Sequence, residues 1–253
     1  MIFPLIDVKI SSIWRADMKY TENYKIKWHD TNADRNVRLS QYLVYMQETA
    51  NLQLRSNGTS LDAVRDEMRL GFILSKIKLV FKKQLSAYDE ISVNTWTCPS
   101  RGFTFSRCFE IERGGERVAE AISFWALLNI DTRMLTRVDG FDLGLESDEP
   151  LDIAVARRIK PPAEELKLLG KREIRYSDID YNMHMNNTKY PDMICDFMPI
   201  DKIADIKEMT LEFLHESALG DTLSFYGANE DGRYYFKTVN ENGDTCLVAE
   251  VLI

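Results

Sequence analysis

A short stretch of the sequence sets a carboxylate, an amide and an imidazole at alternate positions, as Asp180, Asn182 and His184. Asn186 and Asn187 follow, and a helical pattern begins there, with Asn187 or Thr188 as its expected cap. The first N–H groups of a helix have no partner inside the helix, so they point at whatever binds at its start. Such groups can hold a developing oxyanion while a carboxylate or an imidazole transfers a proton. The same residues also suit an ordinary polar turn with Asx caps, so both interpretations stay open at this point.

The same frame occurs twice in the chain, and only the second copy holds an imidazole. The stretch around Trp28 aligns without a gap with the stretch around Tyr176, 148 positions later. The alignment gives five pairs: Asp30 with Asp178, Asn32 with Asp180, Asp34 with Asn182, Asn36 with His184, and Tyr42 with Tyr190. The Asn and Asp side chains of the first copy cap and turn a chain equally well. The chain therefore does not need His184 to make the turn, which favours a chemical role for it.

A second match, further along the chain, places one more carboxylate in the later copy. Residues 211–216 align with residues 79–84 at an offset of 132 positions, and Glu216 stands where the first copy has the neutral Gln84. The change of offset falls where the first copy has extra sequence, roughly residues 60–70, with Ser60 as an expected helix cap. Charged residues in the second copy and neutral counterparts in the first predict an active half and a degenerate half.

Metal binding is the main alternative for this motif, and the sequence argues against it. Asp178, Asp180 and Asn182 resemble the start of a calcium loop, but that loop needs Gly and Glu where Met183 and Lys189 stand. The three histidines are scattered and the cysteines form no C-x-x-C pair. We therefore expect no metal and no other cofactor.

Both copies have the same expected plan: a strand, a polar turn, a helix and four further strands. In the first copy a helix with apolar residues at helical spacing should run from Leu39 to a stop at Asn57 and Gly58, followed by strands over 72–83, 90–98, 103–113 and 117–130. In the second copy a helix near 190–197 precedes strands over 208–216, 221–228, 233–240 and 245–252. Turn pairs at 114–115, 231–232 and 242–243 predict hairpins. A helix laid on a curled antiparallel sheet makes each copy an α+β unit.

This plan predicts an N-terminal unit in residues 1–138, a linker in 139–170 and a C-terminal unit in 171–253. The composition, with 45% hydrophobic residues, is that of a globular protein, and the net charge of −8 argues against nucleic acid as the main partner. No apolar run approaches the roughly 18 residues of a membrane helix, so no membrane insertion is expected. The apolar opening lacks the basic residues of a signal peptide, and four scattered cysteines are typical of reduced thiols. We therefore expect a cytoplasmic protein.

In the motif around Asp180 and in residues 211–216, the sequence resembles the acyl-acyl-carrier-protein thioesterase family of plant plastids and many bacteria, and the resemblance covers nearly the whole chain. It implies two tandem hotdog units, each a central helix wrapped by a curled antiparallel sheet. It also implies a catalytic set at four positions: Asp180, Asn182, His184 and Glu216. Plant members have a Cys directly after that Glu, whereas this chain has Ser217, which argues against a thiol mechanism. Plant members also carry a transit peptide, and none is recognised here, in keeping with a bacterial cytoplasmic enzyme.

The implied reaction is hydrolysis of a fatty acyl thioester to a fatty acid and a free carrier thiol. Helix N-terminal amides near Asn186 and Asn187 would hold the oxyanion, Glu216 would activate a water, and His184 would donate or shuttle a proton. Whether Asp180 or the water attacks stays open. The alternatives are an acyl-CoA thioesterase, whose substrate ends in the same phosphopantetheine arm, a hotdog hydratase or dehydratase, and a non-catalytic acyl-binding module.

The resemblance also implies a role for the N-terminal unit, which is expected to hold the acyl chain. Five apolar residues are candidates for the lining of a tunnel, although each also suits an ordinary core position: Leu39, Leu43, Met46, Phe72 and Ile77. The expected partner is the acyl carrier protein, which is acidic and needs a basic patch on this acidic chain. Two runs are candidates for that patch: Lys76, Lys78, Lys82 and Lys83, or Arg157, Arg158 and Lys160. A homodimer is a further expectation.

Overall fold

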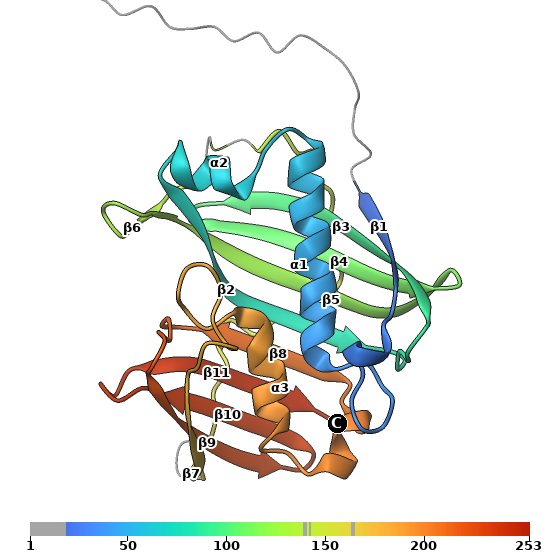
Figure 1. The fold of residues 1–253 in the computed structure, drawn as a ribbon, viewed down its shortest axis with the longest axis vertical. Coiled ribbons are helices and arrows are strands. Elements are labelled where there is room, and N and C mark those ends of the chain that lie inside the picture. Colours follow the sequence, from blue (N-terminus) through green and yellow to red (C-terminus); the bar gives the residue numbers. More distant parts are fainter. Residues whose placement is uncertain (1–18, 139–140, 142, 163–164) are drawn as a thin grey trace, which may run out of the picture.

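The protein is built on one continuous sheet, with helices α1 and α3 lying across the same face of it (Figure 1). The computed structural model describes residues 19–138, 141, 143–162 and 165–253. The strand order is β1-β3-β4-β5-β2-β8-β11-β10-β9-β7, and β6 pairs with β5. The two sequence copies therefore fill the two halves of the sheet, each with its own helix. This is the expected α+β fold of two tandem hotdog units.

In the N-terminal unit the strands wrap around α1 (Leu39–Ser56), and the four strands expected after this helix are confirmed. The strands are β1 (Tyr20–Lys25), β2 (Leu70–Phe81), β3 (Glu90–Arg101), β4 (Thr104–Arg113), β5 (Glu116–Asn129) and β6 (Met134–Thr136). Two short helices complete the unit: η1 (Trp28–Asp30) and α2 (Leu61–Asp66). The short strand β6 was not expected.

The C-terminal unit repeats this plan with a much shorter helix. Its strands are β7 (Lys167–Glu173), β8 (Glu208–Phe213), β9 (Thr222–Glu230), β10 (Arg233–Val239) and β11 (Thr245–Leu252). Its helices are η2 (Asn187–Lys189), α3 (Tyr190–Cys195) and η3 (Ile200–Asp205). Pro191 lies in the first turn of α3, where a missing N–H costs no helical hydrogen bond.

Local signals in the sequence set the ends of the helices in the first unit. The apolar stripe of α1 buries Tyr42, Leu43 and Met46, and the helix ends at Asn57, before Gly58 with φ of 77°. A residue with a side chain tolerates that conformation poorly, so glycine stops the helix there. Ser60 caps α2, as expected, because its hydroxyl accepts a hydrogen bond from Ala63 N at 2.9 Å.

The two units are joined through strands β2 and β8, which pair antiparallel. Ile77 stands opposite Leu211 and Leu79 opposite Met209, and all four side chains are at most 2% exposed. Side chains of both units therefore belong to one hydrophobic core. Because apolar burial is the main stabilising term in folding, this junction fixes how the two units lie relative to each other.

Among the strand boundaries that differ from the sequence predictions, two have a clear structural cause. β8 ends at Phe213, not at 216, because the N–H groups of Leu214 and His215 both donate to Cys246 O and the chain leaves the ladder. Glu216 therefore lies in the loop after β8. β7 begins at Lys167, inside the segment expected to be linker, because a register shift between Leu168 and Gly170 breaks the alternation that would have marked a strand.

Residues 151–155 of the linker pack on the face of the sheet opposite α1. Leu151, Ile153 and Val155 pack against Trp96 and its buried neighbours. Two lysines of β2 bind backbone carbonyls of this part of the linker. Lys78 Nζ donates to Ala154 O at 2.9 Å, and Lys76 Nζ donates to Ala156 O at 2.8 Å. The linker is thus a strap across the outside of both units. Within the described residues, no helix is long and apolar enough to cross a bilayer.

Candidate active site

The turn that carries Asp180 and its counterpart in the first copy have the same backbone hydrogen bonds. Asp180 N donates to His184 O at 3.0 Å, and Asn32 N donates to Asn36 O at 2.8 Å. The residue just before each acceptor has a positive φ, 64° in the second copy and 65° in the first. The repeat at an offset of 148 positions is therefore confirmed in three dimensions.

The repeat at the second offset is confirmed in the same way. Met185 N donates to Ser217 O at 2.8 Å, and in the first copy Val37 N donates to Leu85 O at 2.8 Å. These bonds hold the loop after β8 beside the turn. Because Glu216 lies in that loop, the carboxylate comes next to the imidazole although 31 residues of chain separate them.

His184 and Glu216 face each other in this frame. His184 Nδ1 lies 3.4 Å from Glu216 Oε2, and the two side chains keep 34% and 54% of their exposure, so a ligand can reach both. Asp180 Oδ1 accepts a hydrogen bond from Asn182 N at 2.8 Å. In the first copy the amide oxygen of Asn32 accepts the equivalent bond at 3.0 Å. An amide thus serves the turn equally well, and the negative charge of Asp180 is not needed for the local fold.

Arg65 of α2 reaches the turn from the other unit. Its Nη1 donates to Asn182 Oδ1 at 3.0 Å, and its guanidinium lies 5.0 Å from the centroid of the Tyr181 ring. The sequence did not lead us to expect Arg65 here. The available signal was the extra sequence of the first copy, because α2 lies within it and the second copy lacks it.

The helix after the turn is capped by Asn186, and the expectation of Asn187 or Thr188 was wrong. Asn186 Oδ1 accepts hydrogen bonds from Thr188 N at 2.9 Å and from Thr188 Oγ1 at 2.8 Å. The cap falls earlier because the helix opens with the 3-10 turn η2. Among the described residues no acceptor is bonded to Asn187 N, so this amide is available at the start of the helix.

Comparison with known proteins agrees with this repeated architecture. A family model for the acyl-ACP thioesterase N-terminal domain matches residues 17–140, and one for the acyl-ACP thioesterase C-terminal domain matches residues 164–250. The chain belongs to the acyl-ACP thioesterase family. The two matched ranges contain the two repeated units in the order found along the sheet.

Individual members of the acyl-ACP thioesterase family are distant in sequence. Acyl-[acyl-carrier-protein] hydrolase FATB2, chloroplastic, from Cuphea viscosissima is 26% identical over 219 residues, which are 78% of this chain and 52% of that protein. Oleoyl-acyl carrier protein thioesterase 2, chloroplastic, from Arabidopsis thaliana is 21% identical, with 96% of this chain and 72% of that protein covered. The chain spans about half the length of FATB2 and of a palmitoyl-acyl carrier protein thioesterase, chloroplastic, from Cuphea hookeriana, which it also matches.

Solved structures of acyl-ACP thioesterases have the same fold. An acyl-ACP thioesterase from Bacteroides thetaiotaomicron superposes with a TM-score of 0.85 at 22% identity, covering 93% of this chain and 97% of the other. The 12:0-ACP thioesterase from Umbellularia californica superposes with a TM-score of 0.80 at 20% identity, covering 95% and 98%. Identities this low establish the fold alone.

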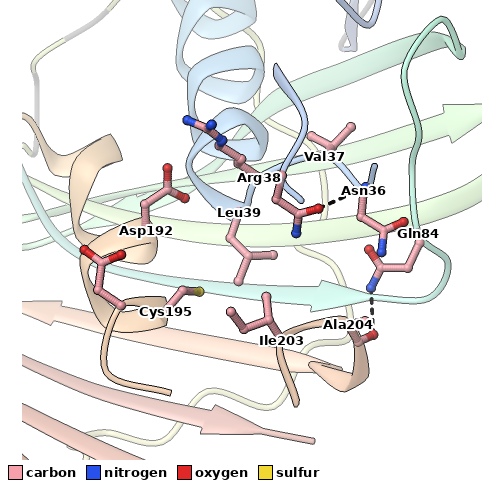
Figure 2. A pocket seen from close by; sticks show the side chains of 11 residues that line it. Asn36, Val37, Arg38, Leu39, Gln84, Asp192, Cys195, Ile203 and Ala204 are labelled. Atoms are coloured by element: carbon pink, nitrogen blue, oxygen red, sulfur yellow. Dashed lines mark hydrogen bonds between the residues drawn. The ribbon is translucent and has the colours of Figure 1, made fainter. Parts of the chain in front are cut away.

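In this member of the family a cavity of about 340 Å³ lies at the counterpart turn of the first copy (Figure 2). Asn32, Asn36 and Gln84 line it, and these are the counterparts of three of the four catalytic candidates, Asp180, His184 and Glu216. The rest of the lining comes from the start of α1 and from the region of α3 and η3: Val37, Arg38, Leu39, Asp192, Cys195, Asp196, Ile203 and Ala204. The first copy thus keeps the backbone frame of the site, with amides in place of the imidazole and of the carboxylates of Asp180 and Glu216.

The N-terminus of α1 is capped by a carboxylate from the other unit. Asp192 Oδ1 accepts a hydrogen bond from Ser40 N at 3.2 Å, and Asp192 Oδ2 accepts one from Ser40 Oγ at 2.7 Å. At the offset of 148 positions the counterpart of Asp192 is the uncharged Val44. The N-terminus of α1 therefore holds the negative charge of Asp192, whereas the counterpart of Asp192 in the other direction, Val44, brings no charge to the helix of the second copy.

The thiol and hydroxyl near the site do not have the surroundings of nucleophiles. Ser217 is 1% exposed, and its Oγ lies 3.0 Å from the hydroxyl of the buried Tyr190. Burial, together with the nearby carboxylates of Asp192 and Asp196, raises the pKa of the Cys195 thiol to about 12. Among the described residues no three His, Cys, Asp or Glu side chains are grouped to hold a metal ion.

The five residues expected to line an acyl tunnel lie in different surroundings. Leu43, Met46 and Ile77 are at most 2% exposed and belong to the main hydrophobic core. Leu39 lines the cavity of the first copy. Phe72 is only half-buried, and its ring lies edge-on to Phe105 at 5.4 Å. Of the five, only Phe72 does not belong to the main hydrophobic core.

Proposed function

We propose that the chain hydrolyses the thioester of a fatty acyl group carried on acyl carrier protein, giving a free fatty acid and the carrier thiol. One observation carries this proposal: of two units with the same backbone frame, only the second sets an imidazole beside a carboxylate, His184 and Glu216, in a position open to a ligand. The names of the relatives, which include an acyl-[acyl-carrier-protein] hydrolase and an oleoyl-acyl carrier protein thioesterase, support the same reaction.

In the proposed mechanism Glu216 acts as the general base. It removes a proton from a water, and the water oxygen attacks the thioester carbonyl carbon. The carbon–sulfur bond then breaks, and His184 gives a proton to the leaving sulfur. The proton on Glu216 restores His184, since 3.4 Å separates the two groups. The products balance as one carboxylic acid and one thiol for each water consumed.

The remaining polar groups have positioning roles in this proposal. Asn187 N, available at the start of η2, is our candidate donor to the oxyanion, and the Asn186 cap fixes the turn that presents it. Asn182 is held from both sides, by Arg65 at its side chain and by Asp180 at its backbone. The charge of Asp180 is not used by the fold of the turn, so we assign it to the orientation of the attacking water.

We further propose a division of labour between the units. The N-terminal unit, residues 1–138, holds the acyl chain, and the C-terminal unit, residues 171–253, performs the chemistry, with residues 139–170 between them. The degenerate frame of the first unit and the half-buried aromatic ring of Phe72 support this division. A cytoplasmic location and a homodimer complete the proposal; gel filtration coupled to light scattering tests the dimer.

The decisive experiment is a thiol-release assay with one acyl group presented on acyl carrier protein and on coenzyme A, over graded chain lengths. The proposal expects thiol release without added metal or cofactor, unchanged in chelator, with carrier-bound acyl groups preferred. Preference for coenzyme A would make the chain an acyl-CoA thioesterase. Altered unsaturation without thiol release would make it a hydratase or dehydratase, and absence of any turnover would leave an acyl-binding module.

A further inference from the structure

Exposed apolar side chains gather on the two loops that carry the catalytic candidates. Tyr181, Met183, Leu214 and Leu219 are 67%, 54%, 53% and 45% exposed. Leu219 N donates to Met183 O at 3.4 Å, so the two loops lie side by side. We refer to these four residues as the rim patch. Large apolar side chains left together in water mark a surface that another molecule covers.

The first copy shows that the fold does not require the rim patch. At the two offsets already confirmed by hydrogen bonds, its four members correspond to Ala33, Arg35, Lys82 and Ala87. The same loops are therefore built with small or charged residues in the degenerate copy. That copy exposes Trp28 and Tyr88 instead, but these two rings stack on each other, with centroids 6.4 Å apart. The rim patch is thus specific to the loops around His184 and Glu216.

One cation lies at the rim patch and is not paired with a carboxylate. The Arg65 guanidinium lies 5.0 Å from the centroid of the Tyr181 ring and donates to the Asn182 amide, and it has no carboxylate within 4 Å among the described residues. In the first copy, Lys82, the counterpart of Leu214, is paired with Glu120. The rim patch therefore combines apolar surface with an unpaired arginine, although the whole chain has a net charge of −8.

The basic runs expected from the sequence lie elsewhere. Lys76 and Lys78 are tied to the strap and to Glu212 and Glu208 of β8. Arg157, Arg158 and Lys160 line a hollow on the strap itself, which packs on the sheet face opposite α1. The cation that lies at the rim patch is instead Arg65.

We propose that the rim patch is the surface on which the acyl carrier protein docks while its thioester lies between His184 and Glu216. This inference rests on the proposed function. The thioester arrives on an arm attached to the carrier, so the carrier must dock within reach of that arm, and the rim patch lies on the two loops that hold the catalytic pair. An acidic carrier is repelled by an acidic enzyme at long range, so a local apolar contact flanked by Arg65 offsets that repulsion.

The test compares two substrates that share one acyl group: the acyl carrier protein thioester and the thioester of N-acetylcysteamine, which has no carrier to dock. The variant Leu214→Ser/Leu219→Ala removes apolar surface from the rim, and Ala is the residue that the first copy holds at the second position. Met183→Ala is an independent variant, because Met183 is also exposed on the rim patch. Ile200→Ala is the control, because Ile200 is 67% exposed on η3, beside the cavity of the first copy.

The expected result is a rise of about tenfold or more in KM for the carrier-bound substrate, with kcat unchanged and with the small thioester hydrolysed as by the wild type. The control should match the wild type on both substrates, and all variants should keep its unfolding midpoint. Equal losses on both substrates, or no loss on the carrier-bound one, would overturn the docking surface. A wild type that hydrolyses the small thioester but not the carrier-bound one would overturn docking and leave the hydrolase, whereas inactivity on both would overturn the proposed function.

Discussion

The carboxylate of Asp192 in the C-terminal unit accepts hydrogen bonds from both the backbone N–H and the hydroxyl of Ser40 in the N-terminal unit, at 3.2 and 2.7 Å. Helix α1 has Arg38 at its N-cap, and this side chain makes no capping hydrogen bond. A residue 152 positions away therefore does what a Ser or Asp at the N-cap does in other helices. The start of the first helix thus depends on the docking of the second unit.

Replacing Asp192 by Ala should lower the free energy of unfolding by about 1–2 kcal/mol, because the cap and the charge at the helix N-terminus are both lost. Urea denaturation followed by circular dichroism measures this. Asp196→Ala is the matched control, since Asp196 lines the same cavity, is exposed, and its carboxylate has no hydrogen bond or ion pair among the described residues. Equal losses in the two variants would show that the cap contributes nothing.

Exchanging three of the four catalytic candidates for the residues of the first copy should stop the chemistry and leave the fold intact. The three variants are Asp180→Asn, His184→Asn and Glu216→Gln. Each should lower kcat by about a hundredfold or more with an unchanged unfolding midpoint, because Asn32, Asn36 and Gln84 occupy the same frame. The reciprocal Ala variants of the first copy should keep kcat. If Asn36→Ala lowered kcat as much as His184→Asn, the assignment of the chemistry to the C-terminal unit would be wrong.

Arg65→Met should lower kcat/KM for the small thioester by about threefold to tenfold, as expected when one partly exposed hydrogen bond to Asn182 is lost. The small substrate separates this effect from carrier docking. Arg55→Met serves as the control, because Arg55 is an exposed arginine in the last turn of α1. If both variants hydrolyse the small thioester like the wild type, Asn182 is oriented without help from the first unit.

Thiol reagents should leave the native enzyme active. With its pKa raised to about 12, the Cys195 thiol is almost wholly protonated at pH 8, whereas in unfolded protein it returns to its ordinary value and reacts. Mass spectrometry after iodoacetamide treatment at pH 8 should find Cys195 unmodified until denaturant is added, and Cys195→Ala should keep most activity. Ser217→Ala should also remain active and lose about 1 kcal/mol of stability with its hydrogen bond to Tyr190. Inactivation that tracks modification of Cys195 alone would contradict this.

Phe72→Ala should shift the preferred acyl chain toward greater length. The half-buried ring can be removed without opening the main core, and each additional buried CH₂ of substrate is worth about 0.8 kcal/mol. Leu43→Ala should instead cost about 2–5 kcal/mol of stability, because Leu43 is fully buried. Assays over graded chain lengths, extended to Ala variants at Leu39, Met46 and Ile77, show which residues set the preferred chain length. If none of the five shifts the length profile, the acyl chain binds in the C-terminal unit.

The sequence by itself determined the repeat, its two offsets and almost every strand. These features depend on local signals: alternation of side chains in strands, helical spacing in α1, and turn pairs such as Gly114-Gly115, whose φ angles of 60° and 80° only glycine adopts readily. Comparison of the copies also singled out His184 and Glu216, because a chain aligned with itself shows which residues the fold does not need.

Only the tertiary structure decided which side chains meet across the units. Asn182 and Arg65 are 117 residues apart, and Asp192 and Ser40 are 152 residues apart. Nothing in the local pattern around either member names its partner, because the pairing follows from how β2 docks on β8 and carries α1 and α2 along. The same docking pairs Lys76 with Glu212 and Lys78 with Glu208, and it places Arg65 beside the Tyr181 ring. Contacts of this kind depend on the relative placement of two packed cores, and a linear pattern of residues does not encode that placement.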